Sequence, residues 1–251
     1  MSQPLASIGV FGGSGLYSLL EDVEEVTLDT PYGATSAPLH LGTVEGRRVA
    51  FLPRHGAHHE HPAHRVNYRA NMWAMKEAGA RTILAPCSAG SLQVHVEPGH
   101  FVVLDQFVDR TSGRADTFFD EGANHTTMAH PYDRAVGAVL AEACRAEGVT
   151  VHEDGTVVVV QGPRFSTRAE SRWFGQMGWD VVNMTQYPEA ALANEAGIPY
   201  AGLALVTDYD AGLEGRDDIE PVTMEQVFAF FTSNIERVRN VLFRAMAALP
   251  A

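Results

Sequence analysis

Polar side chains follow two short apolar runs in the carboxyl-terminal half of the chain. The first run ends at residues 183–185 (Asn-Met-Thr), and the second ends at residues 207–210 (Thr-Asp-Tyr-Asp). Such runs are typical of buried parallel strands, and α/β sheets bind ligands at the carboxyl ends of their strands. We therefore expect two buried parallel strands that present these groups to a ligand. Helix capping or turn formation is the alternative for Asp208 and Asp210.

Two other segments could bind an anion. Residues 12–15 (Gly-Gly-Ser-Gly) offer unshielded backbone N–H groups and the hydroxyl of Ser14, which is how a loop can cradle phosphate. They lack the lysine of a P-loop and the spacing of a dinucleotide fingerprint, so an ordinary turn is the alternative. Arg54 and His55 follow another apolar run. They could supply a bidentate guanidinium and an imidazole donor, or be surface residues.

Five histidines lie between residues 55 and 64, at positions 55, 58, 59, 61 and 64. Zinc sites commonly place two histidines four residues apart on a helix, with a glutamate between them. Pro62 interrupts this segment and no HExxH pattern occurs. We therefore expect a loop that faces solvent or substrate, and no metal site. The absence of a GxSxG motif argues against a serine hydrolase.

Composition narrows the class of protein. The chain has 251 residues, of which 45% are hydrophobic, so it can bury a large core. Its formal charge of −13 argues against a nucleic-acid partner. Cys87 and Cys144 lie far apart and form no CxxC pair, which favours a reducing cytoplasm. No basic segment precedes an apolar run at the amino terminus and no run of eighteen apolar residues occurs, so we expect neither secretion nor a membrane span.

Short apolar runs alternate with amphipathic stretches, which is typical of repeated βα units. We predict strands at 7–11, 49–52, 82–85, 101–107, 157–161 and in the two runs described first, and helices at 66–78, 132–147, from about 167, and at 223–248. Strand 82–85 is expected to break at Pro86. Residues 110–130 read as an irregular functional loop or interface. The predicted fold is one α/β domain over residues 1–251, with a twisted, mixed central β-sheet flanked by helices.

Several motifs in chain order resemble those of the trimeric purine nucleoside phosphorylases. The similarity extends over nearly the whole chain, and several motifs are too long for chance agreement. The similar segments are 8–16 (IGVFGGSGL), 54–56 (RHG), 66–76 (VNYRANMWAMK), 90–92 (GSL), 105–111 (DQFVDRT), 162–170 (GPRFSTRAE), 182–189 (VNMTQYPE) and 207–210 (TDYD).

The resemblance implies that phosphate attacks the anomeric carbon of a purine nucleoside, without a covalent enzyme nucleophile, a cofactor or a metal. The implied substrate is S-methyl-5′-thioadenosine, which would yield adenine and 5-methylthioribose 1-phosphate in methionine and purine salvage. It also implies a homotrimer. The positions that match the family's phosphate site are Ser14, Arg54, His55, Cys87, Ser88 and Thr185.

Other matched positions concern the nucleoside. Asp208 is implied to protonate N7 of the leaving purine, and Asp210 to accept a hydrogen bond from the 6-amino group of adenine. Related 6-oxopurine enzymes use Asn in place of Asp. The matches for the base and ribose are Phe165, Met184 and Thr207. The matches near the 5′ end are His59 and, from a loop of the adjacent subunit, His125; Val222, Val227 and Phe228 are candidate apolar walls or core positions.

Two departures affect these expectations. Family members commonly carry Thr where Cys87 stands, and losing that hydroxyl would cost phosphate binding about 0.5–1.5 kcal/mol. Segment 211–218 (AGLEGRDD) also departs from the expected pattern. A broader adenosine or purine nucleoside phosphorylase and a methylthioinosine phosphorylase remain as alternatives. A nucleosidase, which would not need Arg54, and a noncatalytic nucleoside-binding protein fit the residues less well.

Overall fold

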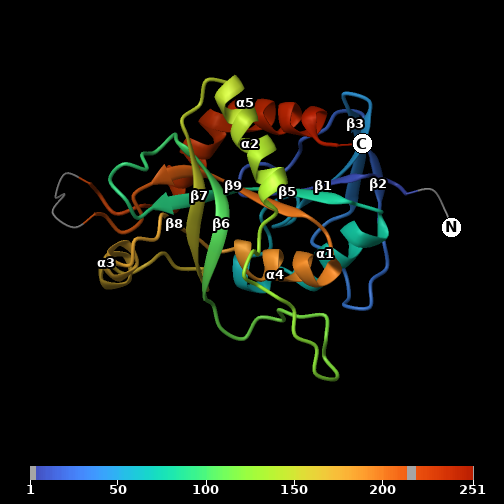
Figure 1. Cartoon of the computed structure of the whole chain (residues 1–251), viewed down its shortest axis with the longest axis horizontal. Helices are drawn as coiled ribbons and strands as arrows, with labels where there is room; N and C mark the ends of the chain where they lie inside the picture. The colour runs from blue at the N-terminus through green and yellow to red at the C-terminus, as the bar shows by residue number, and fades with distance from the viewer. Residues whose placement is uncertain (1–3, 214–218, 251) are drawn as a thin grey trace.

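In the computed structural model, which describes residues 4–213 and 219–250, a mixed β-sheet forms the centre of the molecule (Figure 1). Within these residues the strand order is β2-β3-β4-β1-β5-β8-β7-β6-β9, and β9 also pairs with β5, which closes the last five strands into a ring. The bounds are β1 Ile8–Gly12, β2 Glu24–Val26, β3 Leu39–Val44, β4 Arg47–Pro53, β5 Thr82–Ser91, β6 Phe101–Arg110, β7 Val151–Val160, β8 Val181–Asn183 and β9 Tyr200–Asp208. The predicted mixed central sheet is confirmed.

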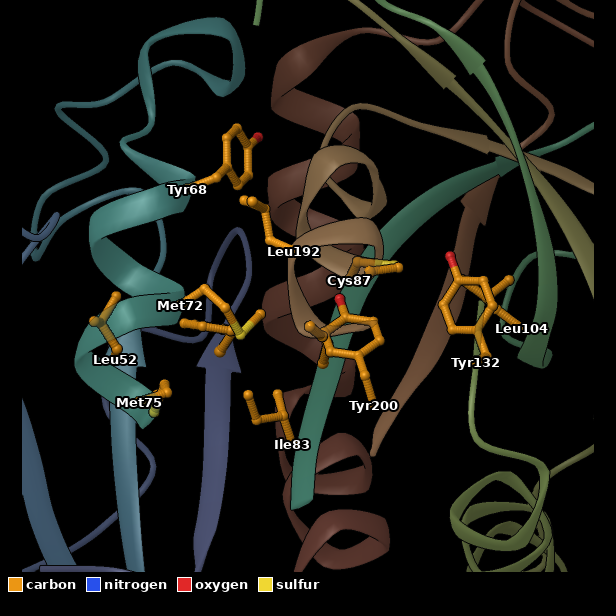
Figure 2. Close-up of a cluster of buried hydrophobic side chains, with 14 of the residues drawn as sticks. Leu52, Tyr68, Met72, Met75, Ile83, Cys87, Leu104, Tyr132, Leu192 and Tyr200 are labelled. Atoms are coloured by element: carbon orange, nitrogen blue, oxygen red, sulfur yellow. The ribbon is translucent and has the colours of Figure 1, made fainter. Parts of the chain in front are cut away.

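Helices cover the sheet on two sides (Figure 1). One side carries α2 with α5, the other carries α1 with α4, and each pair packs together. The helix bounds are η1 Ala63–Arg65, α1 Tyr68–Glu77, α2 Arg134–Ala146, α3 Arg168–Gln176, α4 Gln186–Ala196 and α5 Met224–Ala248. Apolar side chains of each pair bury against the sheet, and removal of this apolar surface from water is the main driving force for the arrangement. Figure 2 shows the core beneath α1 and α4, including Met72, Met75 and Leu192.

Local sequence signals account for the helix starts. The side chain of Thr167 accepts a hydrogen bond from Glu170 N at α3, and Thr223 accepts one from Gln226 N at α5; both starts are capping boxes. Such caps satisfy backbone N–H groups that have no partner inside the helix. The predicted helix starts near 167 and 223 are therefore confirmed.

Strand β5 differs from its prediction. It does not break at Pro86 but continues to Ser91, and it pairs in parallel with β9 through Ala89. The ladder of hydrogen bonds with neighbouring strands keeps the backbone extended past the proline. Cys87 and Ser88 consequently lie inside a strand and not in a turn. The sequence analysis also missed β2, β3 and α4.

The two strands with polar ends do not run parallel to each other. β9 is parallel to β5, whereas β8 is antiparallel to β5, with Val182 opposite Gly90. β8 takes its parallel partner from β7. β8 and β9 therefore lie on either side of β5 and run in opposite directions, because the closed ring combines parallel and antiparallel pairs. The two polar ends still converge beside the second half of β5.

The segment 111–133 contains no helix or strand. The irregular segment was predicted at 110–130, but Arg110 still belongs to β6 and the helix predicted from 132 begins at Arg134. Segment 111–133 forms the long loop that projects from the body below α4 in Figure 1. Glu195 on α4 ties part of it down by accepting hydrogen bonds from Thr117 Oγ1 at 2.8 Å and Phe118 N at 2.7 Å. Among the residues described, no helix is both long enough and apolar enough to cross a membrane.

Candidate active site

A cavity of about 330 Å³ lies where the predicted strand ends meet, next to the first turns of α5. Its walls come from the loops after β1 and β4, the second half of β5, the segments after β7, β8 and β9, and α5. The sequence-predicted residues that line it are Ser14, Arg54, His55, His59, Cys87, Ser88, Phe165, Met184, Thr185, Thr207, Asp208 and Asp210. His125 is not among the lining residues, and its side chain is exposed in segment 111–133.

The glycine loop after β1 depends on the absence of side chains. A Cβ on Gly12 would lie 2.3 Å from the carbonyl oxygen of Leu16 and 2.4 Å from the ring of Phe51. Gly15 has a φ of +83°, and a Cβ there would lie 2.7 Å from Phe231 of α5. Only glycine allows these close approaches without displacement of the neighbouring groups. The loop is thus held tightly where Ser14 enters the cavity wall.

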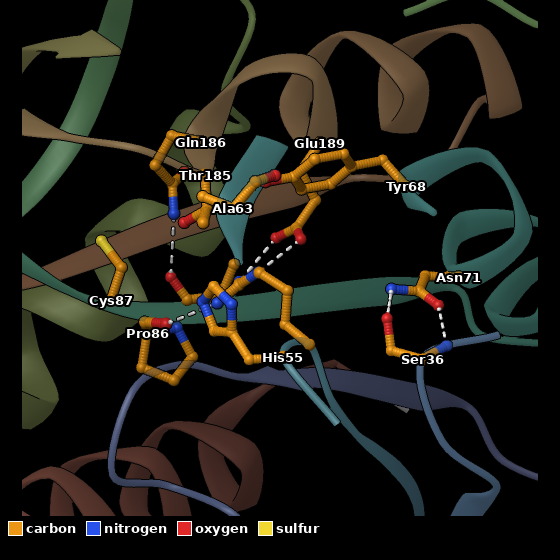
Figure 3. A network of polar contacts seen from close by, with 12 residues as sticks. Ser36, His55, Ala63, Tyr68, Asn71, Pro86, Cys87, Thr185, Gln186 and Glu189 are labelled. Carbon is orange, nitrogen blue, oxygen red and sulfur yellow. Dashed lines mark hydrogen bonds and ion pairs between the residues drawn. The ribbon is translucent and has the colours of Figure 1, made fainter. Parts of the chain in front are cut away.

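Arg54 does not present its paired N–H groups to the cavity. Nε and Nη2 donate to the two carboxylate oxygens of Glu189 at 2.6 and 2.7 Å, in a fully buried pair (Figure 3). The sequence analysis expected this bidentate edge to bind phosphate. The edge that remains carries Nη1, which lies 3.5 Å from the Pro86 carbonyl oxygen. Burial opposes the charge on Arg54, but Glu189 outweighs it and the pKa of the guanidinium is raised, so Arg54 stays protonated.

His55 is a neutral ring with a defined tautomer. Its Nδ1 lies 2.9 Å from the carbonyl oxygen of His61. A carbonyl only accepts hydrogen bonds, so Nδ1 carries the proton and Nε2 is left as an acceptor. Burial and the adjacent Arg54 lower the pKa of His55 to about 3. The expected imidazole donor is therefore not available from this side chain, because its N–H group is already bonded to His61.

The second half of β5 supplies four of the lining residues, Cys87, Ser88, Ala89 and Gly90. Cys87 Sγ accepts a hydrogen bond from Asn183 Nδ2 at 3.3 Å, and burial raises the pKa of this thiol to about 11. Ser88 Oγ is buried and has no hydrogen-bond partner among the described residues. Gly90 leaves room for the opposite wall, since a Cβ there would lie 2.8 Å from Asp208 Oδ1. A hydroxyl with unused hydrogen-bonding capacity thus lies beside the glycine loop and Arg54.

Asp208 and Asp210 form the opposite wall. Asp208 Oδ2 accepts from Thr207 Oγ1 at 2.6 Å, and Oδ1 accepts from the backbone N–H of Asp210 at 2.7 Å. Burial is the main cause that raises the pKa of Asp208 to about 6, against the lowering effect of these two hydrogen bonds. Burial also raises the pKa of Asp210, whose φ is +50°. A carboxyl that titrates near neutral pH can donate a proton to a leaving group.

The wall nearest α5 is mostly apolar. Met224, Val227 and Phe228 line the cavity there, and His59 packs edge-on against Phe228 with ring centroids 5.2 Å apart. Val222, a candidate wall from the sequence, does not line the cavity; its backbone N–H donates to the carbonyl oxygen of Asp210 at 3.0 Å. Of the departing segment 211–218, residues 214–218 lie outside the described residues.

The sequence analysis missed two residues that shape the site. Glu189 pairs with Arg54; it ends the matched motif 182–189 and is an acidic residue within the otherwise apolar stretch 188–193, but neither signal indicates its partner. Arg114, in the irregular segment, donates to the carbonyl oxygens of Met184 and Gln161, both at 2.9 Å. No local pattern marks Arg114. Across residues 4–213 and 219–250, no three His, Cys, Asp or Glu side chains are grouped in a way that could hold a metal ion.

The chain is similar to known proteins over nearly its whole length. A profile of the phosphorylase superfamily matches residues 7–247. The purine nucleoside phosphorylase of Streptomyces coelicolor is 51% identical, with 98% of this chain and 90% of that protein covered. The S-methyl-5′-thioadenosine phosphorylase of Mycobacterium tuberculosis is also 51% identical, over 95% of this chain and 88% of that protein.

A solved structure supports the same relationship. The methylthioadenosine phosphorylase of Schistosoma mansoni, in complex with adenine, superposes with a TM-score of 0.91 at 39% identity. The match covers 96% of this chain and 91% of that one. The resemblance drawn from the sequence motifs is confirmed, and the chain belongs to the phosphorylase superfamily.

Proposed function

We propose that this protein catalyses the phosphorolysis of S-methyl-5′-thioadenosine to adenine and 5-methylthioribose 1-phosphate, in methionine and purine salvage. The observation that carries the proposal is the position of Asp208: a half-buried carboxyl with a pKa raised to about 6 lines a cavity that also holds a glycine loop and an arginine. That combination provides an acid for a leaving base on one wall and an anion site on another.

The proposed reaction begins with phosphate in the anion site. Ser14, Ser88 and Thr185 offer hydroxyls, and the glycine loop offers backbone N–H groups. A phosphate oxygen attacks the anomeric carbon while the glycosidic bond breaks, and the ribosyl group passes through a transition state with oxocarbenium character. The anion and the cationic sugar attract each other, so positioning and electrostatics supply the acceleration.

Asp208 serves the leaving group. As the glycosidic bond breaks, its electron pair moves onto the purine, and a proton from Asp208 reaches N7. With a pKa near 6, roughly a tenth of the carboxyl is protonated at pH 7, and general acids of this kind contribute about a hundredfold or more. Asp210 accepts a hydrogen bond from the 6-amino group. An ionised carboxylate can accept there but cannot donate to O6 of a 6-oxopurine, which favours adenine.

Two relatives that are equally identical to this chain are named for different substrates, so their names do not decide which 5′ group the substrate carries. Met224, Val227 and Phe228 make an apolar wall, which suits a methylthio group better than a hydroxyl. A broader adenosine or purine nucleoside phosphorylase is the alternative, and His59 favours it because its ring could bond a 5′-hydroxyl. Nucleosidase chemistry would leave the buried arginine without a role.

The active protein is proposed to be a homotrimer. His125 lies outside the cavity of its own chain, in a loop that projects from the body. A neighbouring subunit could therefore receive His125 near the 5′ end of its substrate. This proposal rests on the family resemblance and on the exposed position of the loop.

A substrate panel tests the proposed function. The purified protein is given methylthioadenosine, adenosine or inosine, each with and without phosphate, and free base and sugar phosphate are followed. We expect phosphate-dependent release of adenine, fastest from methylthioadenosine. Base release without phosphate would identify a nucleosidase, and a preference for inosine would contradict the roles given to Asp208 and Asp210.

A further inference from the structure

The ion pair between Arg54 and Glu189 is buried directly behind the proposed anion site. The two side chains are 0% and 1% exposed. One edge of the guanidinium, Nε and Nη2, is fully engaged by the carboxylate. The Nη1 end points to the glycine loop, where a Cβ on Gly13 would lie 3.4 Å away. An anion held by that loop would therefore meet Arg54 through Nη1.

Glu189 is itself held in place. Tyr200 on β9, 1% exposed, donates from its hydroxyl to Glu189 Oε1 at 2.7 Å. Glu189 belongs to α4, which begins directly after Thr185 of the cavity wall. The carboxylate thus joins the end of β4, the start of α4 and the interior strand β9. Arg54, at the end of β4, lies 135 residues from Glu189, whereas α4 and β9 follow each other in the chain.

Stability alone explains this pair poorly. Two charges lose their hydration on burial, and their mutual attraction often does no more than offset that cost. The pair fixes the orientation of the guanidinium, because two hydrogen bonds to one carboxylate prevent the group from rotating. Arg54 is also the one lysine or arginine among the described residues that line the cavity.

We propose that Glu189, braced by Tyr200, is a positioning residue for phosphate: it holds the guanidinium of Arg54 so that Nη1 faces the glycine loop. This inference rests on the proposed phosphorolysis. Glu189 makes no contact with the cavity and is not one of its lining residues, so it acts through Arg54.

Charge and positioning predict opposite effects when Glu189 is neutralised. Removal of a negative charge next to the site would by Coulomb attraction alone strengthen anion binding and lower the KM for phosphate. Loss of positioning would weaken it, because a misplaced Nη1 no longer reaches the anion. The sign of the change in KM therefore separates the two roles.

The test is steady-state kinetics of Glu189→Gln, which keeps the side chain's shape and one acceptor oxygen. We expect the KM for phosphate to rise about tenfold while the KM for nucleoside changes less than about twofold. Phosphate should also raise the melting temperature of the variant less than that of the wild type. Arg54→Lys should raise the same KM, and adding Glu189→Gln to it should have little further effect, because both act through one contact.

A control and a second variant keep the proposal falsifiable. The control is Glu195→Gln, which changes another glutamate of α4. Glu195 lies outside the cavity lining and accepts hydrogen bonds from the Thr117 hydroxyl and the Phe118 backbone N–H. The KM of this variant for phosphate should stay unchanged. If Glu189→Gln does not fold, Tyr200→Phe keeps the ion pair and should raise the KM for phosphate about threefold. An unchanged or lowered KM for phosphate, or an equal rise in both KM values, overturns the inference. Wild-type protein that releases base without phosphate instead overturns the proposed function.

Discussion

Asp208 places the needs of chemistry and stability in conflict. Its carboxyl is desolvated, and its pKa is raised to about 6. In the folded chain the protonated form is therefore favoured relative to the unfolded chain. The stability that protonation contributes is fully present below the ordinary pKa of 3.8 and is lost as the pH rises through about 6. At neutral pH the ionised, desolvated Asp208 therefore lowers the stability of the fold, while the same raised pKa lets the carboxyl act as an acid.

Asp208→Asn should consequently stabilise the protein while it impairs catalysis. At pH 8 the free energy of unfolding of the unliganded variant should exceed that of the wild type by up to about 3 kcal/mol, and at pH 5 by less. Its kcat should fall by about a hundredfold or more. In the wild type, kcat/KM should decline as the pH rises above about 6, and in the variant this decline should vanish.

Denaturant unfolding at the two pH values and pH–rate profiles provide the measurements. Asp154→Asn, at an exposed position, is the matched control and should alter neither quantity. A stability difference that is the same at both pH values would show that the buried charge of Asp208 is not its origin.

At the scale of elements, the cavity depends on the segments after β7 and β8, which are held together by an arginine that is distant from both in the sequence. Arg114 donates from Nη1 to the carbonyl oxygens of Met184 at 2.9 Å and Tyr187 at 2.5 Å. From Nη2 it donates to Gln161 O at 2.9 Å. The segments after β7 and β8 are thereby joined, and they carry Phe165 and Met184 into the cavity. A planar guanidinium can bridge several carbonyl oxygens at once, which an ammonium cannot do in the same way.

Arg114→Ala should therefore loosen the part of the cavity proposed to hold base and ribose. We expect the KM for nucleoside to rise about tenfold, with a smaller effect on the KM for phosphate. Arg114→Lys should recover only part of the loss. Arg110→Ala, which removes an exposed guanidinium that lies over the Trp173 ring at 5.0 Å, is the control at the nearby end of β6. Equal changes in both variants would argue against the bridging role.

At the scale of the whole molecule, the proposed trimer would add His125 of a neighbouring subunit to each active site. Every residue assigned to phosphate and base lines one cavity, but His125 does not. The loop that carries it has no helix or strand and projects from the body (Figure 1). Glu195 and Arg114 hold parts of this loop against its own chain, and the proposed trimer would place its exposed His125 beside a neighbouring cavity.

Mixed assemblies test this arrangement. His125→Ala and Asp208→Asn should each lower activity on the nucleoside. When the two variants are unfolded and refolded together, some sites should combine Asp208 from one subunit with His125 from its neighbour, and activity should recover toward that of the wild type. The recovered species should have the mass of three chains by light scattering. Absence of recovery from a properly assembled mixture would place His125 outside the neighbouring site.

The sequence by itself determined the features that short segments encode. Glycines that permit close approach, helix starts near Thr167 and Thr223, and polar groups that follow apolar runs are local properties. They predicted most of the elements and placed Ser14, Arg54, Asp208 and Asp210 at the ends of strands, where the cavity lies. Family resemblance supplied the roles, which no single motif would have carried.

Only the tertiary structure decided how these groups are paired and oriented. Glu189 lies 135 residues from Arg54 and takes the edge of the guanidinium that the sequence assigned to phosphate. The His61 carbonyl determines the tautomer of His55, and pairing with β9 carries β5 past Pro86. Hydrogen-bond partners and burial arise from contacts between distant segments. The local sequence specifies which chemical groups are present, whereas the packed fold determines which of their atoms remain free to bind a ligand.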